Sequence, residues 1–160
     1  MKYDNETILR KQLDRIEREV TGFKGVIDIW DVINEVVIMP IFDKYDNAVT
    51  RICKDKGRVG LIKEVFAKAR QCNPEAVLLL NDFNTSINYE ILIDGCLNAG
   101  VPISAIGIQS HQHQGYWGNY EPEEGGRTLK DLLMDTARYL KSRNVRVKGH
   151  PLCWHTVCAD

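Results

Sequence analysis

The sequence predicts an α/β domain in which helices cover a parallel β-sheet. Helical and extended patterns alternate four times along its 160 residues. The extended segments are short and almost continuously apolar, which is typical of strands buried on both faces of a parallel sheet. Each of them ends in polar residues, and polar side chains at the carboxyl ends of parallel strands are how (β/α) barrels form their active sites.

The amino-terminal half holds two helix–strand units. Asn5 is a suitable cap for a first helix, in which apolar residues at helical spacing share one face: Ile8, Leu9, Leu13, Ile16 and Val20. A first strand is expected over residues 26–33. A second helix is expected over residues 59–71, where Asn73-Pro74 stops it, and a second strand over residues 77–80.

The second half repeats this order. A third helix is expected over residues 86–98, with Gly100 at its end, and a third strand over residues 104–108. A fourth helix is expected over residues 128–143 and a fourth strand over residues 145–147. Four such units in one short chain predict a single domain.

Composition excludes several classes of function. A formal net charge of −1 gives the chain no attraction to nucleic acid or to an anionic membrane. No apolar run approaches the ~18 residues of a membrane span, and no signal peptide precedes the first helix. The five cysteines are odd in number and lack zinc-like pairing, so we expect free thiols: Cys53, Cys72, Cys96, Cys153 and Cys158.

Polar residues follow each predicted strand as four short motifs. They are WDVINE at residues 30–35, NDFN at residues 81–84, QSH at residues 109–111 and KGHPLCWH at residues 148–155. Together these motifs resemble an endo-β-1,4-xylanase of glycoside hydrolase family ten, and the resemblance extends over nearly the whole chain. It implies part of a (β/α) barrel, a xylan or xylo-oligosaccharide ligand, no cofactor and no metal.

The resemblance gives Glu35 the role of catalytic acid/base, whose pKa would be raised by burial and by a neighbouring negative charge. Asn34 would hydrogen-bond the 2-hydroxyl of the sugar, a bond that strengthens in the transition state. Without the companion motifs, an Asn-Glu pair is better explained as a polar cap where a strand meets its loop. The four motifs together favour the glycosidase interpretation.

The remaining site residues also follow from the resemblance. Gln109 and His111 would contact the two carboxylates, whereas turn chemistry explains Asn81 as well as substrate contact does. A floor for the sugar would be formed by an aromatic face and two imidazoles, from His150, Trp154 and His155. Two histidines do not make a zinc site without a third ligand such as His113, so we favour sugar binding.

The family's nucleophile has no counterpart here. The family places it in a Thr-Glu-x-Asp run after the seventh strand, and this sequence contains no such run. The nearest acidic cluster lies in a polar loop and fits a solvated surface: Glu121, Glu123 and Glu124. The motif order also differs. In the family, the segment that resembles residues 149–155 comes before the segment that resembles residues 30–35, whereas here it comes last. Residues 115–126 therefore look like a splice.

These observations predict a permuted half-barrel, natural or engineered, of four helix–strand units. Two copies related by a two-fold axis would bring eight strands together and close the barrel as a homodimer. The predicted function is that of a xylanase-like glycosidase with weak or no hydrolysis. Two alternatives remain open: a non-catalytic xylo-oligosaccharide-binding module, and a self-assembling structural fragment without a ligand. The family is usually exported, although no signal peptide stands in this sequence.

Overall fold

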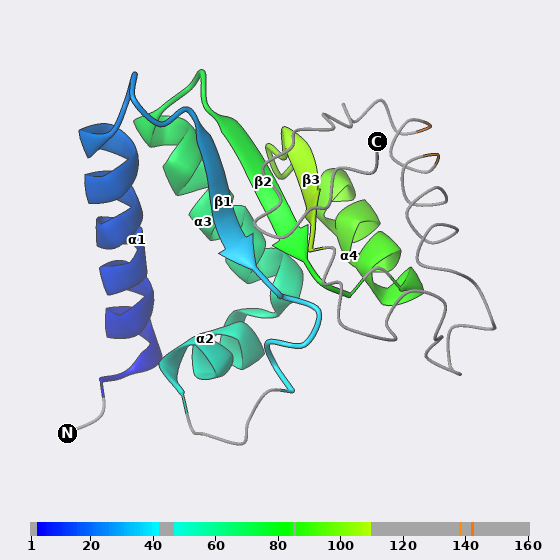
Figure 1. Ribbon diagram of the computed structural model, residues 1–160. Coiled ribbons are helices and arrows are strands. Elements are labelled where there is room, and N and C mark those ends of the chain that lie inside the picture. Colours follow the sequence, from blue (N-terminus) through cyan, green and yellow to red (C-terminus); the bar gives the residue numbers. More distant parts are fainter. Residues whose placement is uncertain (1–2, 42–46, 85, 110–137, 139–141, 143–160) are drawn as a thin grey trace, which may run out of the picture.

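The structure is a computed structural model that describes residues 3–41, 47–84 and 86–109, together with Arg138 and Ser142. Its elements, in chain order, are α1 (Asn5–Gly22), β1 (Ile29–Asn34), α2 (Ala48–Lys56), α3 (Arg58–Cys72), β2 (Val77–Asp82), α4 (Ile87–Asn98) and β3 (Ala105–Ile108). The three strands form one parallel sheet in the order β1-β2-β3 (Figure 1). The predicted parallel α/β arrangement is therefore confirmed for the described part of the chain.

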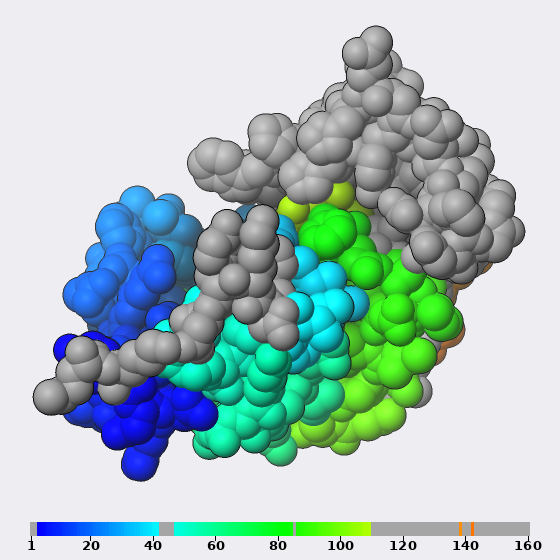
Figure 2. Space-filling view, turned by 90° about the horizontal axis from the view of Figure 1, so that it is seen from below, coloured from blue at the N-terminus to red at the C-terminus, as the bar shows by residue number. Residues whose placement is uncertain are grey.

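The register of the sheet is regular except at one point in β1. Asp31 pairs with Leu79, but the next pair along the strands is Ile33 with Leu80. Val32 is thus one residue more than β2 can match, which is a β-bulge. The chain crosses from strand to strand through helices, and Figure 2 shows these elements following one another in sequence order across one side of the molecule, from α1 in blue to α4 in green.

The core lies between the sheet and its helices. Leu78 and Leu80 of β2 are fully buried against α3 and α4, which contribute Phe66 and Tyr89 with no exposed surface. The Tyr89 hydroxyl lies 2.8 Å from the carbonyl oxygen of Leu80 and 3.2 Å from that of Gly107. One buried hydroxyl thereby satisfies its need for an acceptor and links β2 to β3.

The predicted start of the first strand is wrong by three residues. Val26 and Ile27 donate their backbone N–H groups to the carbonyl oxygen of Phe23, and the left-handed φ of 81° at Gly25 turns the chain there. Val26 is 81% exposed, so its apolar side chain is no sign of burial. The backbone N–H groups of Val26 and Ile27 are bonded within this turn and not to β2, and the strand begins only at Ile29.

The helix boundaries also needed correction. Asp4, rather than Asn5, caps α1, because its Oδ1 accepts a 2.7 Å bond from the N–H of Thr7. One helix was not predicted: α2, a nine-residue helix capped by Asn47, whose side chain accepts a 2.7 Å bond from the N–H of Thr50. The predicted strand 145–147 lies outside the described residues, as does most of the predicted helix 128–143, within which Arg138 and Ser142 are helical.

Candidate active site

Four polar side chains meet at the carboxyl edge of the sheet. Asn34 Oδ1 accepts a 3.0 Å bond from Asn81 Nδ2 and a 2.7 Å bond from Gln109 Nε2. Gln109 Nε2 also lies 3.0 Å from Oε1 of Glu35, which accepts a 3.2 Å bond from Asn34 Nδ2 as well. The structure thus brings together four predicted site residues, one or two from the end of each strand.

Backbone hydrogen bonds just after the ends of β1 and β3 hold Glu35 and Gln109 beside β2. The N–H of Glu35 donates to the carbonyl oxygen of Asn81 at 2.9 Å, and the N–H of Gln109 donates to that of Asp82 at 3.0 Å. Glu35 itself has a φ of 57°, which makes it the one non-glycine residue with left-handed backbone in the described part of the chain. That conformation turns the chain immediately after β1 and fixes where the carboxyl group begins.

Asp82 serves the turn rather than the open site. Its buried carboxylate accepts bonds from the N–H of Val37 at 3.1 Å and of Asn84 at 2.9 Å. Burial raises the pKa of Asp82, the bonds from Asn84 and Val37 oppose that change, and the nearby charge of Glu35 adds to it. Asp82 therefore ties the loop that follows Glu35 to the end of β2.

Asn84 likewise acts in the turn, because its Oδ1 accepts a 3.0 Å bond from the N–H of Ser86. Asn81 differs, since its side chain faces Asn34 and not its own loop. Turn chemistry therefore accounts for Asp82 and Asn84, while substrate contact by Asn81 stays a prediction. Asn81 belongs to the polar network, and Asp82 and Asn84 belong to the turn.

Gly107 makes room for that network. A Cβ atom at this position would lie 2.4 Å from Oδ1 of Asn81, far closer than real Cβ contacts allow. Only glycine lets the amide of Asn81 lie flat against β3 and reach Asn34. Gly107 was not among the predicted site residues, although a glycine inside an otherwise apolar strand is a signal of close approach.

Arg58 also holds the loop after Glu35, through hydrogen bonds to backbone carbonyl groups. Its Nε lies 3.1 Å from the carbonyl oxygen of Val36 and 3.0 Å from that of Val37, and its Nη2 lies 2.6 Å from the latter. A guanidinium satisfies several carbonyl groups at once because its donors are held in one plane. No local pattern revealed this role, since Arg58 lies at the start of α3, more than twenty residues away.

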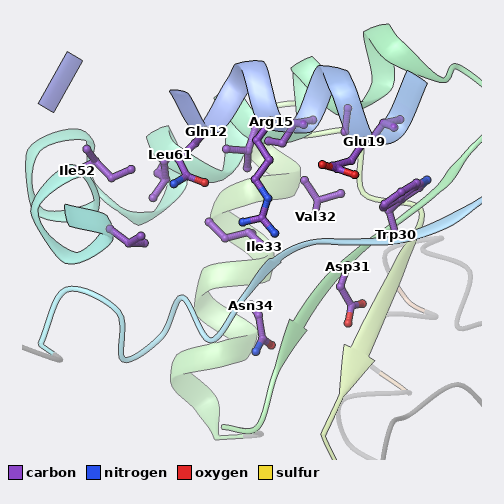
Figure 3. A pocket seen from close by; sticks show the side chains of 15 residues that line it. Gln12, Arg15, Glu19, Trp30, Asp31, Val32, Ile33, Asn34, Ile52 and Leu61 are labelled. Atoms are coloured by element: carbon purple, nitrogen blue, oxygen red, sulfur yellow. The ribbon is translucent and has the colours of Figure 1, made fainter. Parts of the chain in front are cut away.

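Two hollows border the network. One of about 180 Å³ lies beside Glu35 and is lined by residues of the loop after β1 and of α2: Asn34, Glu35, Ile38, Met39, Asn47 and Thr50. The other, of about 330 Å³, lies between α1 and β1 (Figure 3). Asn34 lines both, so the amide at the centre of the network is accessible from two sides.

His111, His150, Trp154 and His155 lie outside the described residues, as does the acidic cluster of the loop 115–126. Within the described residues no three metal-ligating side chains cluster, and no helix is long and apolar enough to cross a membrane. Cys53, Cys72 and Cys96 are free thiols, as expected.

Comparisons with a family model and with individual proteins point to the same family of glycosyl hydrolases. A family model described as glycosyl hydrolase family 10 matches residues 2–132. The chain is 32% identical over 130 residues to endo-1,4-beta-xylanase A of Cellvibrio japonicus, covering 71% of this chain and 21% of that protein. It is 29% identical over 119 residues to endo-1,4-beta-xylanase C of Paenibacillus barcinonensis, covering 66% of this chain and 11% of that protein.

Solved structures agree with this result at the level of the fold. The GH10 structure from Paenibacillus barcinonensis matches with a TM-score of 0.68 at 22% identity, covering 91% of this chain and 42% of that one. Native xylanase 10B from Thermotoga maritima matches with a TM-score of 0.64 at 25% identity, covering 87% and 41%. These are (β/α) barrels, so the described sheet and helices correspond to part of such a barrel, and the chain spans less than half of either.

Proposed function

The chain belongs to glycosyl hydrolase family 10, and from this premise we propose that the carboxyl edge of its sheet binds β-1,4-xylan or xylo-oligosaccharides. The observation that carries the proposal is the network of Asn34, Glu35, Asn81 and Gln109, in which amides and one carboxylate converge on an open edge. Amides and carboxylates are suitable partners for sugar hydroxyls, because together they supply donors and acceptors. Relatives named endo-1,4-beta-xylanases support the choice of sugar.

Glu35 is proposed as the acid/base. Both described side-chain bonds to its carboxyl group reach Oε1, from Asn34 and from Gln109. Oε2 is therefore the oxygen suited to carrying a proton to the glycosidic oxygen, while the two amides hold the group in place. Asn34 is proposed to bind the sugar 2-hydroxyl, and His111, His150, Trp154 and His155 are proposed to complete the sugar site.

Hydrolysis is proposed to be weak or absent. Cleavage with retention needs a second carboxylate about 5–5.5 Å from the first, to attack the anomeric carbon. The sequence contains no Thr-Glu-x-Asp run that resembles the nucleophile segment of the family. An acid without a nucleophile can protonate the leaving oxygen but cannot form the covalent intermediate.

Release of reducing sugar from xylan tests this proposal. We expect a rate orders of magnitude below the typical enzyme median of ~10 s⁻¹, and we expect Glu35→Gln to abolish whatever rate there is. Glu75→Gln is the matched control, because Glu75 is exposed at the opposite end of β2. A rate near the median would show that a second carboxylate exists, and a trace unaffected by Glu35→Gln would show that it comes from a contaminant.

Calorimetric titration with xylohexaose separates binding from catalysis. Trp154→Ala should weaken the affinity more than Trp117→Ala, because Trp154 follows a predicted strand end whereas Trp117 lies in the loop 115–126. Binding without hydrolysis would support the alternative function, a non-catalytic binding module. Equal effects of the two substitutions, or no binding by the parent chain, would contradict the assignment of a sugar site.

We further propose that the chain is a rearranged half-barrel that pairs with a second copy. The support is its coverage of 42% and 41% of the two solved barrels, together with the open outer edges of β1 and β3 in the described sheet. Exposed edges invite pairing with another chain, and a two-fold dimer would remove them. Light scattering tests this, since a monodisperse species of 18.3 kDa with a cooperative melt would refute it.

A further inference from the structure

Glu35 holds a backbone conformation that needs support from the rest of the molecule. Its φ of 57° lies in the left-handed region, where the side chain of any residue other than glycine crowds its own backbone. Such a conformation persists only when the surrounding structure imposes it. Contacts on both sides of Glu35 must therefore outweigh the strain.

The contacts before Glu35 come from the sheet. β1 pairs with β2 as far as Asn34 and Asn81, and the N–H of Glu35 then donates to the carbonyl oxygen of Asn81 at 2.9 Å. These bonds fix the direction in which the chain arrives. They do not fix the direction in which it leaves, because φ and ψ of Glu35 rotate everything that follows. The bond from the N–H of Met39 to the carbonyl oxygen of Glu35 lies within the loop and turns with it.

Beyond Glu35, side chains from two other elements hold a single residue, Val37. Its backbone N–H donates to Oδ2 of Asp82 at 3.1 Å. Its carbonyl oxygen accepts two bonds from Arg58, at 3.0 Å from Nε and 2.6 Å from Nη2. A carboxylate and a guanidinium thus hold the two polar backbone groups of one residue, and bonds to charged groups are stronger than bonds between neutral ones. We call Asp82 and Arg58 the Val37 clamp.

Both residues of the Val37 clamp are themselves anchored outside β1. Asp82 is the last residue of β2 and has no exposed surface, and its Oδ1 accepts a 2.9 Å bond from the N–H of Asn84. Arg58 is the first residue of α3, and its Nε also lies 3.1 Å from the carbonyl oxygen of Val36. The clamp therefore ties the loop to β2 and α3, so it can direct the exit from β1 against the local preference of Glu35.

We propose that Asp82 and Arg58 are positioning residues, which keep Glu35 in its left-handed conformation by holding Val37 two residues later. With the clamp in place, Oε1 of Glu35 lies 3.0 Å from Nε2 of Gln109. Without it, rotation of Glu35 to a negative φ relieves the strain and turns its side chain away from Gln109. The value of this position for proton transfer rests on the proposed function, whereas the backbone argument does not depend on any sugar.

Packing of the loop is the competing explanation. The side chains of Val36 and Val37 are 0% and 7% exposed and belong to the core, so their burial also favours the turn. Polar groups favour the clamp as the stronger cause. The bond between Val37 and Asp82 is buried, and a buried N–H or carboxylate that loses its partner is costly. Rotation at Glu35 would separate these two groups, so their bond resists it directly.

NMR spectra of the whole chain test the proposal. The nuclear Overhauser effect between the amide and α protons of Glu35 should be strong, because these protons lie closer together at a φ of 57° than at a negative φ. We expect Arg58→Gln to remove the strong signal and to shift the side-chain amide of Gln109. Asp82→Asn should do the same, because its amide has one acceptor oxygen for two backbone N–H groups. Arg58 is only partly buried, so its variant serves where Asp82→Asn does not fold.

Val36→Ala is the matched control. It removes buried apolar contacts beside the clamp but none of the backbone bonds to Arg58. The chain should become less stable while the strong signal of Glu35 stays. Loss of that signal in Val36→Ala to the same extent as in the clamp variants would overturn the proposal, because packing would then impose the turn.

Urea unfolding provides a second test, which uses the strain itself. Arg58→Gln is compared in the parent and in a chain that carries Glu35→Gly. Glycine adopts the left-handed conformation freely, so loss of the clamp relieves no strain in that chain. Arg58→Gln should therefore lower the unfolding midpoint more in the Glu35→Gly chain than in the parent. Equal reductions, or a strong signal of Glu35 that survives both clamp substitutions, would overturn the proposal.

The outcomes for the clamp and for the sugar site are separable. Loss of the strong signal in the clamp variants, in a chain that neither binds xylohexaose nor hydrolyses xylan, would support the clamp and contradict the sugar site. Xylan hydrolysis that requires Glu35 but continues unchanged in Arg58→Gln and Asp82→Asn would contradict the clamp and leave the sugar site supported.

Discussion

β1 and β2 are neighbouring strands of equal length, yet they differ in how the protein uses them. In β2 the alternate residues Leu78, Leu80 and Asp82 have no exposed surface. In β1 no residue is fully buried, and Val32 bulges out of register. The central strand is fixed by its contacts on both sides. The edge strand leads directly into Glu35, the proposed acid/base, and depends on neighbours for its position.

This difference shows how the edge strand is kept in place. Glu35 is held by amides from two other positions, Asn34 and Gln109, and by the backbone of Asn81. Its following loop is held by Asp82 and Arg58. Nearly all of these partners belong to β2, α3 or the end of β3. The geometry of the acid is therefore set mainly by the better packed part of the molecule.

The largest expected effect is a loss of stability in β2. Leu80→Ala should lower the free energy of unfolding by about 2–5 kcal/mol, because it leaves a cavity in a fully buried position. Val32→Ala in β1 should cost about 1 kcal/mol or less, because its side chain is only half-buried. Urea denaturation measures both, and equal costs would show that β1 is packed as tightly as β2.

The next effect concerns the contact between β2 and β3. Gly107→Ala should cost about 1–3 kcal/mol through overpacking, because the new Cβ meets Asn81 at 2.4 Å. It should also shift the side-chain amide signals of Asn34 in an NMR spectrum. Gly60→Ala in α3 is the control: its Cβ would lie 3.8 Å from the Cβ of Lys56 in α2, so it should be neutral or stabilising. Unchanged Asn34 signals in Gly107→Ala would contradict the close approach.

A third effect depends on pH. Burial beneath the sheet raises the pKa of the Cys96 thiol from 9.0 to about 12. Between these values only the unfolded chain releases the proton, so stability should fall as pH rises above 9, by up to about 1.4 kcal/mol per pH unit. Cys96→Ala should reduce that slope in urea titrations.

Leu92→Ala provides the control for the thiol. Leu92 lies on the same helix, α4, and is buried but does not titrate. Its substitution should therefore lower stability by the same amount at every pH and leave the alkaline slope unchanged. A slope that survives Cys96→Ala would show that other groups are responsible for the loss.

The smallest effect is expected at the end of β1. Arg58→Lys keeps the charge but loses the planar set of donors to Val36 and Val37, at a cost of about 1 kcal/mol. Its main result should be local: backbone NMR shifts at residues 35–37, with β2 unaffected. Arg10→Lys, on the exposed side of α1, is the control. NMR shift changes spread evenly over the sheet would contradict the conclusion that β1 and β2 are held in place by different contacts.

Strong local patterns made much of the fold predictable. The apolar run of β2 and the stop signals after α3 and α4, Asn73-Pro74 and Gly100, place these elements within about two residues of their observed ends. The start of β1 was not predictable in this way, because an apolar Val26 follows a glycine turn and stays exposed. Nor was α2, whose nine residues depend on the Asn47 cap and on packing against α1 and α3.

The candidate site likewise contains residues that could be predicted from the sequence and residues that could not. Asn34, Glu35, Asn81 and Gln109 come together because the carboxyl ends of parallel strands share one edge, which sequence order alone implies. Gly107 and Arg58 act through contacts between segments far apart in the chain, at distances that no local pattern encodes. The sequence therefore predicted which polar side chains meet at this edge, but not Gly107 and Arg58, which help to position them.

The left-handed backbone at Glu35 has a consequence for how such a chain changes over generations. A φ of 57° costs a glutamate about 1–2 kcal/mol relative to glycine, which adopts it freely. Substitution of Glu35 by glycine should therefore stabilise the chain and remove the proposed acid. A library of variants selected only for folding should drift towards glycine or asparagine at position 35, and one selected for sugar turnover should keep the glutamate.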